Sequence, residues 1–273
     1  MVGRAWDGIF ARAAGVSLHS KVLAAVLLVC CWVPASAGAT QTVTLHTSFS
    51  PNKLGASTTI GFGFQIASAG GGLPSPVTGL SLHLPVGIDY VSTTLGLAIC
   101  QPADLLARGL SACPPNSRLG FGSALVEVPF GTGAGHEIPE IQALMGPSHN
   151  GNIVVLFYAN GQSPVSAQII FQGELISGSE SLGGSLNAVI PLIPSVTNGP
   201  PVSILETQAT IGPSHLTYYT HRHGKKVAFH PKGVSEPRSC PPGGFVFSAD
   251  FTFLDGTSTV ANSVVPCPPS RRR

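Results

Sequence analysis

The sequence predicts an all-β protein: an antiparallel β-sandwich, either one extended sandwich or two packed ones, with one short helix and two disulfides. Three observations predict this class. Only 10% of the residues are charged, whereas glycine (33 residues) and proline (24 residues) are abundant, as strands joined by frequent turns require. Runs in which apolar and polar residues alternate recur between those turns. The third observation is an even number of cysteines, four, beyond residue 37.

Residues 1–37 are predicted to be a secretory signal peptide. Cationic residues precede an apolar run at 22–33, and small residues follow it. The run is too short to span a bilayer comfortably, and the order of charge, apolar run and A-x-A sites is typical of cleaved leaders. Cleavage is expected near Ala37 or Ala39, although the sequence leaves open whether the leader is retained as an anchor. We therefore expect a protein that is secreted or held at the cell surface.

The strands are predicted from alternation between turn-forming residues. In segment 58–67, for example, Ile60, Phe62, Phe64 and Ile66 fall on one face. The predicted strands are 41–48, 58–67, 77–84, 119–128, 140–145, 152–158, 165–175, 186–193, 202–211, 245–253 and 257–265.

Local signals add further elements between the strands. Residues 102–109 predict a short helix that a glycine ends. Asn160-Gly161 predicts a tight turn, and Asp255-Gly256 predicts a type I′ hairpin between the last two strands. The polar segment 218–226 is expected to be a basic connection.

The late cysteines predict structural disulfides in an exported chain. Four cysteines admit three connectivities, and proximity favours Cys100–Cys113 and Cys240–Cys267. The second pair would close the last hairpin at its open end. A zinc site is the rival interpretation, but the sequence lacks C-x-x-C spacing and a neighbouring Cys/His cluster.

Residues 38–267 are expected to form the β-sandwich region, followed by a basic C-terminal tail at 268–273. A sub-boundary near 147–151 or 194–201 is left open, because each stretch also suits a long loop. Residues 38–218 hold three bases and eight acids, a net of −5, whereas residues 219–273 hold eight bases and three acids, a net of +5. The two parts either attract each other, or simply solvate their own faces, or present a basic face to an anionic cell-wall polymer, a lipid headgroup or nucleic acid.

One basic segment combines aromatic and cationic side chains and is the candidate binding surface. A metal held by His221, His223 and His230 is disfavoured, because neighbouring cations oppose it. No catalytic residue, metal ligand or cofactor is predicted. The candidate surface consists of Tyr218, Tyr219, His221, Arg222, His223, Lys225 and Lys226.

Catalytic motifs are incomplete in this sequence. Segment 178–183 lacks the G-x-S-x-G spacing of a nucleophile elbow, and we interpret it as a loop. Glu137 and Glu140 are interpreted as two surface acids. A hydrolase would be favoured if either of them, or Glu174 or Asp89, shared a pocket with a histidine.

Two segments, 100–120 and 240–267, together carry about 50 residues of a recognisable pattern. The first joins Cys100 to Cys113-Pro-Pro-Asn-Ser-Arg-Leu-Gly, and the second joins Cys240-Pro-Pro-Gly-Gly-Phe to Phe-Thr-Phe-Leu-Asp-Gly-Thr and Cys267. Both resemble uncharacterised secreted β-rich proteins of high-GC Gram-positive bacteria. The resemblance implies export, two local disulfides and a β fold, and it implies no activity.

The leading interpretation is an exported, non-enzymatic envelope or extracellular β-protein that binds a ligand or has a structural role. Its expected partners are an anionic cell-wall polymer or another envelope protein, and nucleic acid is not expected. The mature chain has no second apolar stretch of transmembrane length. Two alternatives stay open: a secreted hydrolase that acts on envelope polymers, and a basic-face binder of anionic polymer.

Overall fold

The computed structural model describes residues 40–164, 166–178 and 183–269. The predicted signal peptide and residues 270–273 lie outside this part, as do residues 179–182 of the predicted loop. The strands are β1 (Gln41–Ser50), β2 (Ser57–Ser68), β3 (Val77–His83), β4 (Arg118–Phe130), β5 (Gly133–Glu137), β6 (Glu140–Met145), β7 (Ile153–Gly161), β8 (Ala167–Ile176), β9 (Ser185–Val189), β10 (Ser203–Ile211), β11 (Tyr218–Arg222), β12 (Lys225–Phe229), β13 (Val234–Ser235), β14 (Phe245–Phe253) and β15 (Ser258–Val265). The helical elements are α1 (Pro102–Arg108) and the 3-10 turns η1 (Val91–Thr93), η2 (Gly109–Ala112) and η3 (Pro115–Ser117).

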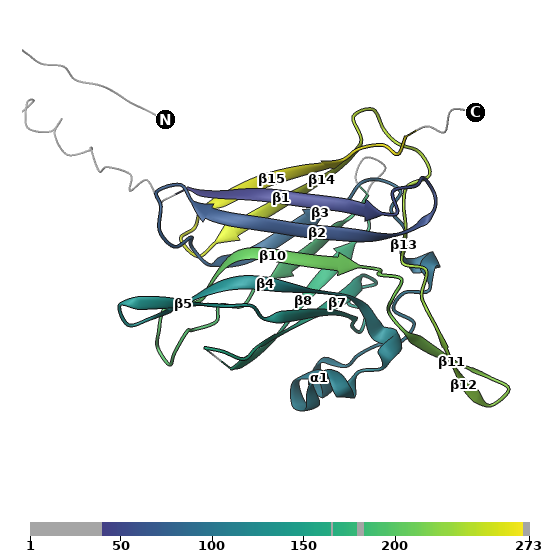
Figure 1. Cartoon of the computed structure of the whole chain (residues 1–273), viewed down its shortest axis with the longest axis horizontal. Helices are drawn as coiled ribbons and strands as arrows, with labels where there is room; N and C mark the ends of the chain where they lie inside the picture. Colours follow the sequence, from purple (N-terminus) through teal and green to yellow (C-terminus); the bar gives the residue numbers. More distant parts are fainter. Residues whose placement is uncertain (1–39, 165, 179–182, 270–273) are drawn as a thin grey trace, which may run out of the picture. The chain divides into compact units, whose positions relative to one another are not determined.

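Most strands join one antiparallel sheet, which confirms the predicted fold class. The order along this 13-stranded sheet is β1-β2-β10-β4-β6-β7-β8-β9-β3-β14-β15, with β13 added to β2 and β5 added to β4. In Figure 1, β1, β2, β10 and β4 run across the view, and the strands of the returning half cross behind them. The sheet thus folds over on itself, and its two halves face each other as the layers of a sandwich.

The two edge strands of this sheet nearly close it. Side chains join β1 to β15: the Thr47 amide donates a hydrogen bond to Ser263 Oγ at 3.1 Å, and Thr259 Oγ1 donates to the Gln41 carbonyl at 2.7 Å. The free edges of β1 and β15 therefore face each other, so neither is left open to pair with a strand of another molecule.

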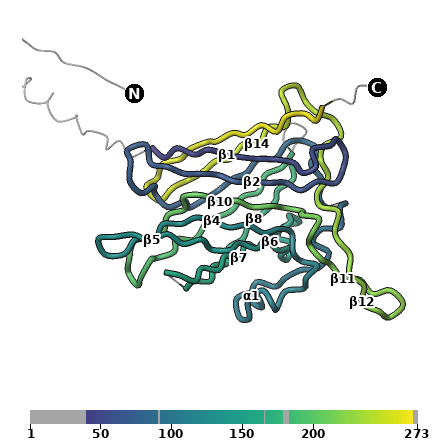
Figure 2. The backbone as a smooth tube through the Cα atoms, in the orientation of Figure 1, coloured from purple at the N-terminus to yellow at the C-terminus, as the bar shows by residue number. Residues whose placement is uncertain are grey.

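Helix α1 covers the outer face of β6 and β7, as Figure 2 shows below the sheet. Leu105 is fully buried there in a cluster with Leu144 and Leu156. Pro102 occupies the first turn, where its missing N–H costs nothing, and Gly109 ends the helix with a φ of 66°. The predicted helix is confirmed.

Both predicted disulfides are confirmed. Cys100 is bonded to Cys113 beside α1, and Cys240 is bonded to Cys267 at the open end of the β14–β15 hairpin. Each disulfide therefore joins two residues close in the sequence and closes a local loop.

Removing the second disulfide is expected to destabilise the fold strongly. The Cys240→Ser/Cys267→Ser double variant opens a loop whose two ends are 27 positions apart in the sequence, and the chain-entropy model gives a loss of about 3.6 kcal/mol in the free energy of unfolding. Urea denaturation of the oxidised protein and the variant measures it. A loss below about 1 kcal/mol would show that the hairpin is held without the bond.

Three local predictions are wrong. Asn160 and Gly161 do not turn the chain but pair with β8 as the end of β7, because the strand pairing continues past them. Segment 218–226 is not a connection but contributes to the hairpin β11–β12. The β14–β15 turn is not type I′, since only Gly256 of the Asp255-Gly256 pair has a positive φ.

Candidate functional site

The interior of the folded sheet is filled in one part. Phe245, Phe247 and Phe251 of β14 are fully buried. The rings of Phe49 and Phe245 meet edge to face with centroids 5.4 Å apart, and those of Phe64 and Phe251 do so at 5.0 Å. This side of the sandwich, between β1, β2 and β14, is an ordinary close-packed core.

The other part, between β4 and β10 on one side and β7, β8 and β9 on the other, is hollow. Each of these strands places an alanine on its inward face, and its short side chain does not reach the opposite wall. These alanines are Ala124, Ala159, Ala167, Ala188 and Ala209. Larger inward residues of these strands and of the neighbouring β2, β3 and β6 stay only half-buried: Phe62, Leu80, Ile141, Phe157, Ile169, Phe171, Leu186 and Ile204.

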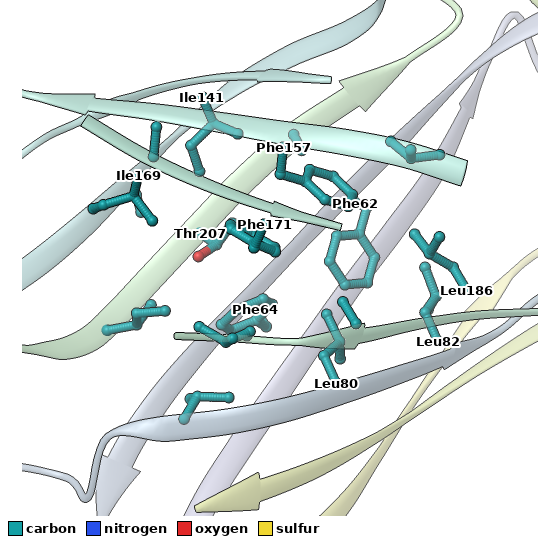
Figure 3. Close-up of a pocket in the computed structure, with 18 of the residues that line it drawn as sticks. Phe62, Phe64, Leu80, Leu82, Ile141, Phe157, Ile169, Phe171, Leu186 and Thr207 are labelled. Carbon is teal, nitrogen blue, oxygen red and sulfur yellow. The ribbon is translucent and has the colours of Figure 1, made fainter. Parts of the chain in front are cut away.

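These walls enclose a cavity of about 240 Å³. Figure 3 shows Phe62, Phe157 and Phe171 among its lining side chains. Phe157 and Phe171 stack with centroids 5.0 Å apart and an angle of 19° between their planes. Nearly all lining side chains are hydrocarbon, and apolar cavities of about 150 Å³ already stay dry and admit small apolar molecules. The cavity is therefore the candidate functional site.

One end of the cavity is closed by the loop after β3 and by β13. Tyr90, Leu95 and Val234 line this end, and the last two are buried. The loop is pinned because the Asp89 amide donates a hydrogen bond to the Ser235 carbonyl at 3.1 Å.

The opposite end is crossed by segment 190–202, which joins β9 to β10. Ile190, Leu192 and Ile193 line the cavity, and Leu192 is also 44% exposed, so the lining reaches the molecular surface here. The segment is held by its own hydrogen bonds, such as that from the Val202 amide to the Ile193 carbonyl at 2.8 Å. We take this end as the mouth of the cavity.

Glu137 lines the cavity near the same end, and its carboxylate is already hydrogen-bonded. The residue is 8% exposed, and its Oε1 accepts hydrogen bonds from the backbone amides of Gln162 and Ser163. Glu140 belongs instead to a hollow on the outer face of the sheet. The expectation of two surface acids is thus wrong for Glu137, and the two carboxylates do not form a pair in one cleft.

That outer hollow, about 890 Å³, crosses β1, β2, β10, β4 and β6. Its floor is polar, and its side chains bind one another: Gln65 Nε2 and Gln208 Nε2 both donate to Glu206, at 3.3 and 2.6 Å. Because these amide donors are already bonded to Glu206, they are not free to bind a ligand. We therefore consider the interior cavity the better candidate site.

The predicted binding surface lies on the β11–β12 hairpin, which Figures 1 and 2 show extending away from the sheet. Tyr218 is fully buried and belongs to the core. Lys226 Nζ lies 4.1 Å from the centre of the Tyr219 ring and covers it. The exposed members are His221, Arg222, His223, Lys225 and Lys226.

Acid–histidine pairs are found on the outside of the sheet rather than in the cavity. Glu174 Oε1 lies 2.5 Å from His149 Nδ1, and Asp250 Oδ2 lies 2.7 Å from His83 Nε2. None of these four residues lines the cavity. Of the acids that the sequence singled out, Glu140 does share a pocket with a histidine, His46, in the outer hollow, whereas the interior cavity is lined by Glu137 and by no histidine of the described residues.

Glu236 is a buried carboxylate outside the cavity. It is 1% exposed, its Oε2 accepts a hydrogen bond from the Lys53 amide, and its Oε1 has no partner among the described residues. Burial raises the pKa of this carboxyl, and the Lys53 hydrogen bond offsets part of that rise. The folded protein thus holds the proton more tightly than the unfolded chain does.

We expect this carboxyl to make stability depend on pH. Its contribution is fully present below the ordinary carboxyl pKa and is lost as the pH rises through the raised pKa of the folded state. Glu236→Gln should therefore gain stability relative to the wild type as the pH rises above the ordinary carboxyl pKa of about 4.3. Urea denaturation at a series of pH values above that pKa measures the difference, and parallel curves for the two proteins would contradict the expectation.

The described residues include no group of three or more His, Cys, Asp or Glu side chains placed to hold a metal ion. Within the same part of the chain, no helix is long and apolar enough to cross a membrane. Comparisons of the chain with protein-family models, with curated proteins and with solved structures found no match.

Proposed function

We propose that the protein is an exported, non-enzymatic binding protein that carries a lipophilic molecule in the cavity of its folded sheet. The observation that carries this proposal is the cavity itself: about 240 Å³ of space among hydrocarbon side chains, next to a core that is otherwise filled. A protein gains stability by filling such a space, so a hollow kept by five inward alanines suits a ligand better than it suits structure alone.

The ligand class follows from the lining. Hydrocarbon walls give no orientation to a sugar or a charged metabolite, whereas they favour an apolar chain by about 0.8 kcal/mol for each buried methylene. The cavity extends from Tyr90 to Leu192 across several strands. An elongated aliphatic or polyene molecule therefore suits it better than a compact polar one.

Fluorescence titration tests the proposal. The protein, with both disulfides formed, is titrated with the neutral dye N-phenyl-1-naphthylamine, and straight-chain alcohols of increasing length then displace the dye. We expect saturable binding at one site, and a competitor affinity that rises about fourfold per methylene until the cavity is full. Dye fluorescence that rises without saturation, or alcohols that displace it independently of their length, would overturn the proposal.

Export is the second part of the proposal. It is supported by the predicted leader at 1–37 and by two disulfides, which form in oxidising compartments. N-terminal sequencing of the protein recovered from the culture medium and cell surface tests it. A first residue at Gly38 or Thr40 is expected, and an intact chain with free thiols in the cytoplasm would overturn it.

A second candidate function rests on the β11–β12 hairpin, where five basic or histidine side chains are exposed. These side chains suit an anionic cell-wall polymer, whose binding would weaken steeply as salt is added. Co-sedimentation with anionic and neutral wall polymers at low and high salt distinguishes this function from cavity binding, which salt should leave nearly unchanged.

A further inference from the structure

The cavity wall is interrupted by an alcohol side chain in its central region. Thr207 of β10 faces inward, and in the sheet it lies opposite Phe64 of β2 and Ala124 of β4, both of which line the cavity. Figure 3 shows its oxygen, in red, among the carbon atoms of apolar side chains. The neighbouring inward positions of β10, Ala209 and Ile211, are apolar.

The Thr207 hydroxyl has no hydrogen-bond partner within the described residues. Valine has the same shape and the same preference for strands, and it would line an apolar wall without leaving a hydroxyl unsatisfied. An unpaired hydroxyl in a dry cavity is costly unless something binds it.

A second unpaired hydroxyl lies at the closed end. Tyr90 lines the cavity, and its Oη is buried without a partner in the described part of the chain. Burial raises the pKa of this phenol, so it stays protonated and able to donate a hydrogen bond.

Most buried alcohols elsewhere in this fold are satisfied; among the described residues the exception is Ser195 Oγ, which is buried without a partner in the segment that crosses the mouth of the cavity. The fully buried Tyr218 donates to the Arg118 carbonyl and accepts from the Gly96 amide. Ser117 Oγ and Ser203 Oγ, both buried, each donate to a proline carbonyl at 2.7 Å. Of these three unsatisfied hydroxyls, those of Thr207 and Tyr90 belong to residues that line the cavity, whereas Ser195 belongs to the segment at its mouth.

From this coincidence we infer that the ligand is an oxygenated lipophile: a long apolar chain that carries a hydroxyl or carbonyl group within its length or at its inner end. This inference rests on the proposed function, since it assigns the ligand class of the same cavity. The hydroxyls of Thr207 and Tyr90 are the groups that would bind the ligand oxygen. A saturated chain without such an oxygen would leave both of them unpaired.

The test compares stearic acid with isomeric hydroxystearic acids that carry the hydroxyl at different carbons, each as a competitor of N-phenyl-1-naphthylamine. We expect at least one isomer to displace the dye at about a tenfold lower concentration than stearic acid, the gain of a satisfied hydrogen bond. In Thr207→Val or Tyr90→Phe, the ratio of the two affinities should fall to about one for the isomer that the lost hydroxyl recognises.

Thr210→Val is the matched control, because Thr210 lies on the same strand but does not line the interior cavity, and it should retain the wild-type ratio. The inference is overturned if stearic acid and every isomer bind the wild type equally, or if the preference survives in both Thr207→Val and Tyr90→Phe. Either outcome leaves the proposed function standing. If the folded wild type binds neither the dye nor any fatty acid, the proposed function falls, and the inference falls with it.

Discussion

Replacing Ala188 with phenylalanine is expected to abolish binding of lipophilic molecules while the fold is retained. Ala188 lies on the inward face of β9, opposite Leu80 of β3 and Gly173 of β8. In a filled core, such an enlargement costs about 1–3 kcal/mol, because neighbours must move. Here the ring has an empty space to enter, so we expect the free energy of unfolding to change by less than about 1 kcal/mol. Dye titration and urea denaturation of the same sample measure both effects.

The neighbouring residue supplies the matched control. Val189 is 78% exposed and does not line the cavity, so Val189→Phe adds the same ring to the opposite face of the same strand. It should bind the dye as the wild type does. If Ala188→Phe still binds normally, the dye does not occupy the cavity. A loss of stability above about 3 kcal/mol would instead show that the space is not available.

Truncating a phenylalanine should cost far more stability in the filled part of the interior than in the hollow part. Phe247 is fully buried, and its ring centroid lies 5.7 Å from that of Phe49. Phe247→Ala is expected to lower the free energy of unfolding by about 3–5 kcal/mol, through lost burial and the cavity that it leaves.

Phe171→Ala is the paired change on the cavity wall. Phe171 is half-buried, stacks on Phe157 and lines the cavity, so its removal enlarges an existing space and should cost about 1–2 kcal/mol. Urea denaturation of both variants gives the comparison. Equal losses would contradict a division of the interior into filled and hollow parts.

The strands could be predicted because their signal is local. Alternation in 58–67 and 245–253 placed Ile60, Phe64 and Phe251 on inward faces, and the structure confirms those faces. The same signal is weak in β11, where polar and basic residues follow one another and the hairpin extends from the sheet. Short pairings such as β13 with β2 form between segments distant in the chain. Their sequences alone do not predict them.

The cavity could not be predicted, because it depends on the order of strands. Strand β10 lies between β2 and β4, and this insertion brings Thr207 between Phe64 and Ala124. Alternation shows that Phe62 and Phe64 share a face, but it does not show that both border an open space or that Phe64 also packs on Phe251. The one signal available was alanine at inward positions of otherwise apolar strands.

The candidate surface on the basic segment was predicted from residue types alone. In the structure, some of its residues are buried and others are exposed. Tyr218 lies at the base of the hairpin, where its ring packs edge to face against that of Phe229 with centroids 5.8 Å apart. The charged residues beyond it are exposed. The sequence-based prediction therefore placed a core residue in the same surface as exposed residues. Alternation does not separate them, because buried and exposed positions of this segment are both polar or aromatic.

Diffraction from a crystal under xenon pressure tests the hollow interior most directly, because xenon enters dry apolar cavities without needing a specific partner. We predict xenon between Phe62, Phe157 and Phe171 in the wild type, and its loss from that place in Ala188→Phe. Density for ordered water at this place, or side chains that close the space and leave no xenon there, would contradict the account.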